Sequence, residues 1–498
     1  MSLLDRTIVA AAWNYLGTGA RIIGQLVAQI VLARLIGPHP FGIVALAILP
    51  ILFSCLIVDL GLGSALVQQH SLTQDEVGAA WSRTTLMGLI VTAVLCLAAH
   101  PLSMLLGTSQ IEPVIRWLSP VTLLYGLSVV PVAALRRQLD MKRIQFSQLG
   151  AYLTGYVGVG VFTAWLGAGV WALVAAWLTF YAMAFVLALY FSRLKLRFGS
   201  PFRGTGQLHN FGKKIMYTNL LNWVVENFDN LAVGRFFGAQ SLGLYAVSYN
   251  LTRAPANHIV TSLQAALFPA SARMQDNAAN LQRGYLAVVS AISLLAIPVF
   301  LSMAAVSQTL VLALFGDQWE GASGIVAPLA IAMIFHVIMA VSGPILAGQG
   351  RPEIELRVQL WTGLLFFGLL IAASTSSLTV IAWSVLGIYV IRMVWLTTAL
   401  LKCLMITGTS FMRVLYGPVT LGVVVAGAIW GFDNPSMEPS HSFRLAGDIL
   451  LSVSVMSILL LWKPTYFLSD ELREVACRVI DTHPSIKGIG LLRRLVVS

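Results

Sequence analysis

The chain has 498 residues, of which 58% are hydrophobic and 10% charged, and its formal net charge is +11. Charged residues alone make up roughly a quarter of an ordinary soluble protein, so this composition excludes the soluble class and predicts an all-α polytopic membrane protein. The four cysteines have no paired spacing, and they predict neither a disulfide framework nor a metal site.

Apolar segments that could cross a bilayer recur along the whole chain. A membrane-spanning helix needs about 20 mostly apolar residues, and by this measure the sequence predicts about 14 transmembrane helices. Their expected ranges are 8–35, 41–66, 79–99, 114–135, 146–166, 169–191, 213–237, 243–270, 284–307, 323–347, 357–376, 378–402, 412–431 and 443–462. Polar residues in the first range, Asn14, Arg21 and Gln25, argue for a span rather than a signal peptide.

Basic residues gather in alternate connections between these spans and in the C-terminal tail, while the intervening connections hold few. The positive-inside rule therefore predicts that both termini are cytoplasmic. The basic residues assigned to the cytoplasmic side are Arg136, Arg137, Lys142, Arg143, Arg193, Lys195, Arg197, Arg203, Lys213, Lys214, Lys402, Arg413, Lys463, Arg473, Arg478, Lys487, Arg493 and Arg494. No nucleic acid partner is expected, because the basic clusters are divided among separate loops.

A motif near the start of the chain occurs twice. The segment from Arg34 to Ala45 recurs 201 residues later, from Arg235 to Ala246. The residues that define this repeat motif are Arg34, Gly37 and Gly42 in the first copy and Arg235, Gly238 and Gly243 in the second. Because internal duplication is typical of membrane transporters, the repeat predicts a transporter.

A polar stripe precedes each copy of the motif. Its members are Thr18, Arg21, Gln25 and Gln29 in the first copy and Asn219, Asn222, Glu226 and Asn230 in the second. A spacing of about four residues places each set on one face of a helix. Such a face is costly in lipid, so we expect it to meet a water-filled cavity. The alternative is that the amides only hold neighbouring helices together.

The repeat also divides the chain into regions. Six predicted spans precede the second copy, and an even number gives both copies the same orientation in the membrane. We therefore expect two parallel six-helix lobes plus two extra helices. The predicted regions are an N-lobe at 1–192, a cytoplasmic basic linker at 193–212, a C-lobe at 213–402, spans 13 and 14 at 403–462, and a cytoplasmic tail at 463–498.

Four segments carry a resemblance to a known family: Leu32–Gly42, Asp59–Gln68, Pro131–Lys142 and Leu314–Trp319. They resemble bacterial Wzx-type polysaccharide-transport flippases, whose superfamily also contains multidrug extruders and the peptidoglycan lipid flippase. The resemblance implies translocation of undecaprenyl-diphosphate-linked oligosaccharide repeat units across the bacterial inner membrane, to the periplasmic leaflet, by alternating access. It also implies that the protein acts together with a polysaccharide polymerase and export machinery and that it needs no cofactor.

Residues for such a substrate can be chosen by their chemistry. A diphosphate needs cations in a cavity that tolerates charge, and the planar fork of arginine suits phosphate oxygens. Arg21, Arg253 and Arg392 lie several turns inside predicted spans. Aromatic and amide side chains suit sugars, and the candidates are Gln25, Asn222, Tyr245, Tyr249 and Asn250. Each arginine could instead form a structural ion pair with a carboxylate inside the membrane.

Transport against a gradient needs a coupling ion, and carboxylates within spans are the usual carriers. The candidates are Asp59, Glu226 and Asp229. Asp59 precedes Gly61 and Gly63, where tight helix packing could explain it. The pattern does not decide between H+ and Na+.

Two further classes of protein compete with a flippase for lipid-linked oligosaccharide. A membrane-embedded polymerase or ligase would need a large extracytoplasmic loop with catalytic residues, which the pattern does not show. The expectation is therefore a transporter and not an enzyme. Within transporters, a cation-coupled multidrug extruder and a flippase for lipid-linked peptidoglycan precursors are the alternatives.

Overall fold

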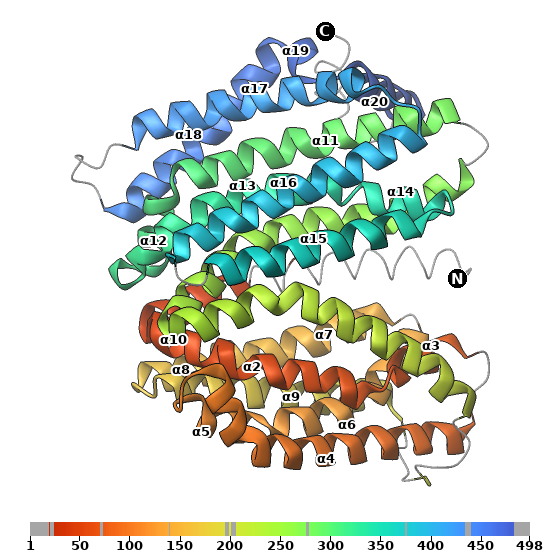
Figure 1. The fold of residues 1–498 in the computed structure, drawn as a ribbon, viewed down its shortest axis with the longest axis vertical. Coiled ribbons are helices and arrows are strands. Elements are labelled where there is room, and N and C mark those ends of the chain that lie inside the picture. The colour runs from red at the N-terminus through yellow and green to blue at the C-terminus, as the bar shows by residue number, and fades with distance from the viewer. Residues whose placement is uncertain are drawn as a thin grey trace. The chain divides into compact units, whose positions relative to one another are not determined.

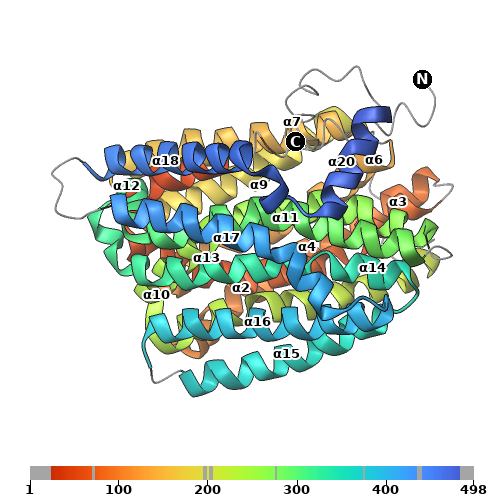
Figure 2. The same ribbon diagram turned by 90° about the horizontal axis from the view of Figure 1, so that it is seen from above.

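A computed structural model describes the chain in helices (Figures 1 and 2). The residues that it describes are 19, 24–69, 73–138, 140–194, 199–200, 206–274, 278–373, 376–433 and 440–482. These residues form two compact units, Met1–Ala246 and Val247–Ser498. The predicted boundary at 193–212 differs from this division, which falls inside helix α10, so the assignment of spans to lobes stays a prediction.

The first unit begins with the helix Gly24–Ile36. It continues with α2 (Pro38–Asp59), α3 (Leu62–Gln68), α4 (Gln74–Leu106), α5 (Ile111–Leu118), α6 (Pro120–Arg137), α7 (Met141–Tyr152), the π-helical η1 (Leu153–Gly160), α8 (Val161–Trp165), α9 (Val170–Ser192) and the first part of α10 (Gly206–Arg273). Helix α6 packs against both α4 and α9. The indole of Trp81 on α4 lies in an apolar cluster with residues of α3 and α6, and its Nε1 donates to Leu127 O at 3.3 Å.

The second unit holds the rest of α10 and the helices that follow. These are α11 (Ala278–Ala305), α12 (Ser307–Phe315), the 3-10 turn η2 (Asp317–Ala322), α13 (Ser323–Met339), α14 (Ser342–Gly348), α15 (Pro352–Ala373), α16 (Leu378–Cys403), α17 (Gly408–Phe432), α18 (His441–Trp462), α19 (Pro464–Phe467) and α20 (Asp470–Thr482). Helix α13 packs between α11 and α16, and α17 packs on α11 (Figure 1).

Ten helices of the described part are long and apolar enough to span a bilayer. They confirm a polytopic, helical membrane protein. Four predicted spans are not counted by this criterion. The span 8–35 lies outside the described residues before position 24, apart from residue 19, and its remainder falls on the short helix Gly24–Ile36. The spans 146–166, 213–237 and 243–270 fall on the interrupted run from α7 to α8 and on the two parts of α10. The total of 14 spans therefore stays a prediction.

The repeat motif has the same backbone in both copies. Gly37 adopts φ 84° and ψ 172°, and Gly238 adopts φ 81° and ψ 177°. A positive φ of this kind is open to glycine and strained for other residues. Each glycine thus breaks a helix and lets the next one begin, which explains why the motif keeps glycine at these two equivalent positions.

A second pair of motif glycines brings two helices together within the first unit. A Cβ atom built on Gly42 would overlap Ala239 O and lie 2.9 Å from Gly243 N, and one built on Gly243 would overlap Pro38 O and lie 3.0 Å from Gly42 N. The start of α2 and the part of α10 after Gly238 therefore meet backbone to backbone. Equivalent positions of the two copies make equivalent contacts, as a two-fold repeat requires.

Candidate functional site

A polar cluster in the second unit contains two of the predicted arginines. Tyr249 and Arg253 come from α10, His336 from α13, and Tyr389 and Arg392 from α16. The arginines are each one turn from a tyrosine, at i+4 and i+3, so each helix presents a phenol and a guanidinium on one face. The packing of α13 on α16 then brings His336 to the same place.

Aromatic contacts join these helices. The hydroxyls of Tyr249 and Tyr389 lie 3.2 Å apart, within hydrogen-bond distance. The guanidinium carbon of Arg253 lies 5.4 Å from the centre of the Tyr249 ring, a cation–π distance. The His336 ring meets the Tyr389 ring edge to face, with centroids 5.4 Å apart and planes at 87°. Arg253, Tyr249, Tyr389 and His336 therefore form one continuous series of contacts between α10, α16 and α13.

The charge of the cluster is positive. Arg253 and Arg392 both lie close enough to His336 for their charges to act on its ring. Glu355 of α15 lies near enough to Arg392 to feel its charge and rests against Gly343, where a Cβ would lie 2.6 Å from both carboxylate oxygens. Nε of Arg392 is buried, and no residue in the described part accepts a hydrogen bond from it. An anion with oxygen acceptors would satisfy this donor.

The remaining predicted binding residues lie elsewhere. Gln25 and Asn222 are exposed in the first unit, and Asn250 is exposed beside the buried Tyr249 because neighbouring residues of a helix point about 100° apart. Arg21 lies outside the described residues. The roles assigned to these four positions stay predictions.

Asp229 and Tyr245 form a buried pair in the first unit. The Tyr245 hydroxyl donates to Asp229 Oδ2 at 2.8 Å, and the backbone N–H of Asn230 donates to Asp229 Oδ1 at 2.8 Å. The side chains are 4% and 0% exposed, respectively. The pair joins the two parts of α10 across the break at Gly238. This contact uses the Tyr245 hydroxyl, and the Tyr245 side chain is buried.

The other two predicted coupling carboxylates differ from each other. Asp59 accepts a hydrogen bond from the backbone N–H of Gly63 at 3.1 Å and caps the turn between α2 and α3. Glu226 is exposed. Ion coupling through Asp59, Glu226 or Asp229 stays a prediction.

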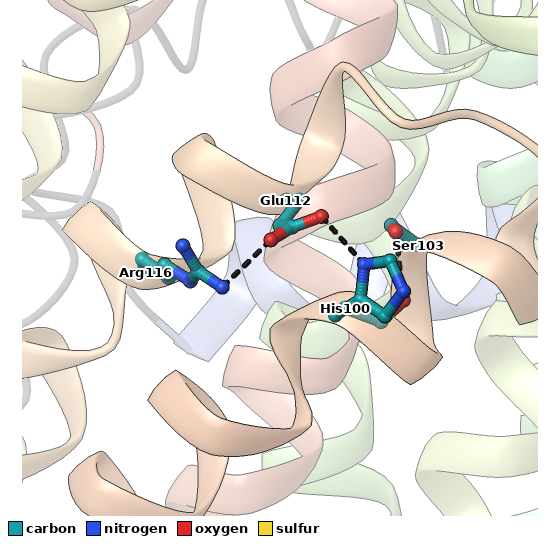
Figure 3. A network of polar contacts seen from close by, with 4 residues as sticks. All are labelled: His100, Ser103, Glu112 and Arg116. Atoms are coloured by element: carbon teal, nitrogen blue, oxygen red, sulfur yellow. Dashed lines mark hydrogen bonds and ion pairs between the residues drawn. The ribbon is translucent and has the colours of Figure 1, made fainter.

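A polar network joins α4 to α5 in the first unit (Figure 3). Glu112 lies between His100 Nδ1, at 2.9 Å, and Arg116 Nη2, at 2.7 Å, and Ser103 Oγ donates to His100 O at 2.7 Å. No sequence pattern indicates this network, since its members are spaced as ordinary polar residues at helix ends.

We expect Glu112→Gln to have a small effect. The side chains of His100 and Arg116 are 57% and 53% exposed, and exposed ion pairs contribute little to stability. The melting temperature of the purified protein should change by no more than about a degree or two. A large drop would show that the network holds α5 in place.

Sequence reasoning missed Tyr389, Glu355 and His336 as members of the cluster. Tyr389 pairs with Tyr249, 140 residues away. No spacing rule links positions so distant. The only usable signal was Arg392 itself, because the residue one turn before a buried arginine shares its face.

Comparison with known proteins places the chain in a family. The sequence profile described as "Polysaccharide biosynthesis protein" matches residues 31–324, more than half of the chain. The chain belongs to this family. The match includes both copies of the repeat motif, and the resemblance stated from the sequence is thereby confirmed.

Individual relatives agree with the family. The lipopolysaccharide biosynthesis protein WzxC of Escherichia coli (strain K12) is 25% identical over 372 residues, which cover 74% of this chain and 75% of WzxC. The succinoglycan biosynthesis transport protein ExoT of Rhizobium meliloti (strain 1021) is 25% identical over 386 residues, covering 77% of this chain and 76% of ExoT.

A solved structure shows the fold. The lipid II flippase MurJ, in an inward closed conformation, superposes with a TM-score of 0.69 and 11% identity, covering 92% of this chain and 99% of MurJ. At this identity the likeness concerns the fold alone. The relatives, among them a transport protein, bear out the expectation of a transporter and not an enzyme.

Proposed function

We propose that this member of the polysaccharide biosynthesis family flips undecaprenyl-diphosphate-linked oligosaccharide repeat units from the cytoplasmic to the periplasmic leaflet of a bacterial inner membrane. The observation that carries the proposal is the cationic, aromatic cluster at Arg253, His336 and Arg392, with the buried Nε of Arg392 open to an acceptor. Family membership supports the substrate class, and the flippase fold supports movement between leaflets.

The cluster suits a diphosphate by charge and shape. A diphosphate brings about two negative charges and many acceptor oxygens, and a bidentate guanidinium can hold two of these oxygens at once. Within a membrane, an unpaired diphosphate and an unpaired guanidinium each have a high free energy, so the two groups are favoured to pair. The arginine cluster would therefore hold the headgroup at the depth at which the carrier must pass.

The sugar would meet aromatic and amide side chains. Tyr249 and Tyr389 offer ring faces and hydroxyls beside the arginines, and both are suited to stacking on a sugar ring. We keep Asn250, Asn222 and Gln25 as proposed amide contacts and leave out Tyr245, because its hydroxyl is bonded to Asp229. A polysaccharide polymerase that consumes the flipped unit is the proposed partner in the membrane.

Alternating access is the proposed mode of transport, with both termini in the cytoplasm and a cation, H+ or Na+, as the proposed coupling ion. The two-fold motif contact at Gly42 and Gly243 supports a repeat architecture, and repeats that rock about a fixed site are the usual basis of alternating access.

Reconstitution tests the proposal. Proteoliposomes that contain the purified protein and a fluorescent undecaprenyl-diphosphate oligosaccharide should move the label to the opposite leaflet, where a membrane-impermeant quencher reaches it. Empty liposomes and liposomes with a boiled sample are the controls. Transport of a cationic drug, or of a lipid-linked peptidoglycan precursor, without transport of the oligosaccharide lipid would replace the proposed substrate with the corresponding alternative.

A further inference from the structure

Helix α18 buries an acidic residue and exposes its apolar residues, the opposite of what is usual in a water-soluble protein. All of its residues from His441 to Trp462 are described, and Asp448 is the only one of them that is fully buried, at 2% exposure. Apolar neighbours such as Ile449 and Leu450 point outward and are 55% and 69% exposed. Lipid explains the outward apolar face. It does not explain an acid at the inward position, which marks a function in a membrane protein.

Asp448 faces a second acid. Helix α18 packs on α12 and α17 (Figures 1 and 2). Asp433, at the end of α17, takes a hydrogen bond from the Thr309 hydroxyl of α12, whose Oγ1 lies 2.9 and 2.7 Å from its two oxygens. Asp448 lies close enough to Asp433 and to Arg444 for their charges to interact. Neither carboxylate oxygen of Asp448 has a hydrogen-bond partner in the described part of the chain.

The local charges do not balance when both acids are ionised. Two carboxylates, Asp433 and Asp448, stand against one guanidinium, Arg444, which lies one turn before Asp448. A buried carboxylate without donors costs several kcal/mol, and a like charge beside it adds to this cost. One proton removes the excess charge. No group of three or more His, Cys, Asp or Glu side chains that could hold a metal ion occurs among the described residues.

Apart from Arg444, the nearest titratable residue before Asp448 on α18 is His441, two turns earlier at the end of the helix where Asp433 lies. Helix α12 carries no charged residue. Tyr416 and Tyr466, whose hydroxyls lie 3.1 Å apart, mark the opposite end of the α17–α18 pair, together with Arg413 and Lys463. Glu438, in the connection between the two helices, lies outside the described residues.

We propose that Asp448 is a proton-binding residue within the membrane, in a site completed by Asp433 and Thr309, and that it exchanges its proton through the end of α18 where Asp433 lies. Asp448 is seven residues into α18, so it lies about 10 Å along the helix from that end. The site gives a role to the two extra helices, which have no counterpart in the repeat. The proposal that Asp448 binds a proton does not depend on the proposed function. The proposal that this proton drives transport rests on the proposed function.

Infrared difference spectroscopy of the purified full chain in lipid nanodiscs tests proton binding directly. At neutral pH the wild type should show the C=O stretch of a protonated carboxylic acid, shifted in D2O, and Asp448→Asn should lose it. Asp470→Asn, at the exposed start of α20, is the matched control that should keep the band. Asp433→Asn removes the like charge beside Asp448, so it should weaken the band at neutral pH. A wild type without the band, or an Asp448→Asn protein that retains it, overturns the proposal. So does loss of the wild-type band on adding NaCl at constant pH, which would assign the site to Na+.

A second variant covers a failure to fold. If Asp448→Asn does not reach the membrane, Asp448→Glu keeps the acid, and its band must appear at a changed frequency; an unchanged frequency assigns the band to another residue and overturns the proposal. In flipping assays, an imposed pH step should accelerate the wild type and leave Asp448→Asn unaffected. An equal response in both overturns the coupling role. Failure of the wild type to flip the substrate at all counts against the proposed function, while the infrared result still decides proton binding.

Discussion

Arg392→Ala should reduce oligosaccharide flipping by roughly 10- to 100-fold, because a hydrogen bond to a charged group contributes about 1.5–3 kcal/mol. The buried Nε of Arg392 has no acceptor in the described part of the chain, so the substitution leaves no hydrogen-bond acceptor there unpaired, although Glu355 loses a nearby positive charge. The loss should therefore appear mainly in transport, and the melting temperature of the variant measures any loss of stability. Initial rates of flipping in proteoliposomes, at matched protein content, measure it.

Two further variants test whether the planar guanidinium group of Arg392, and not only its positive charge, is needed for transport. Arg392→Lys keeps the charge and loses the bidentate geometry, so it should recover only part of the rate. Arg283→Ala removes an arginine from α11 whose only described ion pair is with Glu474, at 3.4 Å and largely exposed, and it should transport at the wild-type rate. Wild-type rates in both Arg392→Ala and Arg253→Ala would refute the proposed diphosphate site.

Part of this site could be predicted because a charged residue within an apolar segment can be recognised from the sequence alone. An arginine inside an apolar run is costly in lipid, so Arg253 and Arg392 could be selected from the sequence without a structure. Their convergence on His336 could not, because it depends on how α10, α13 and α16 pack. Helix packing is set by the shapes of whole faces, and these do not appear in the spacing of any one segment.

Asp229 has a partner that the sequence does not reveal. Its position within an apolar run predicts a coupling role, which stays a prediction; the structure adds that the break at Gly238 folds the chain so that Tyr245 reaches it. The glycine was visible in the sequence as part of the motif, whereas the hydrogen bond across the break was not. Asp448 lies in the predicted span 443–462 and has the same sequence signal as Asp59, Glu226 and Asp229, but only the packing of α18 shows that its oxygens lack donors in the described part of the chain.

The repeat motif was the most informative part of the sequence because each of its glycines is needed for a particular backbone geometry, either a positive φ or a close contact between helices. Gly37 and Gly238 have equivalent positive φ values, and Gly42 and Gly243 have equivalent close contacts. Side chains can change while such backbone geometry is kept, which is why Pro38 and Ala239 differ at a position where only the carbonyl is used. The duplication is therefore visible in the glycines more clearly than in the residues between them.

Gly243→Ala should destabilise the protein by about 3 kcal/mol or more, at the upper end of the usual cost of overpacking. The new methyl group would overlap Pro38 O, and Gly42→Ala would likewise overlap Ala239 O. Backbone atoms cannot rotate away as a side chain can, so α2 and α10 must separate. Gly363→Ala is the matched control: no atom lies within 4 Å of its Cβ, and alanine in a helix interior should stabilise it by roughly 0.5–1 kcal/mol.

The double variant makes the sharper test. Once one methyl group has forced the helices apart, the second meets no backbone, so Gly42→Ala with Gly243→Ala should cost clearly less than the sum of the two single substitutions. Contacting sites depart from additivity by about 0.5–3 kcal/mol, whereas independent sites add. Melting temperatures of the four proteins in one detergent measure the coupling. Strict additivity would show that Gly42 and Gly243 act at separate contacts, and that the two copies of the motif do not meet at this crossing.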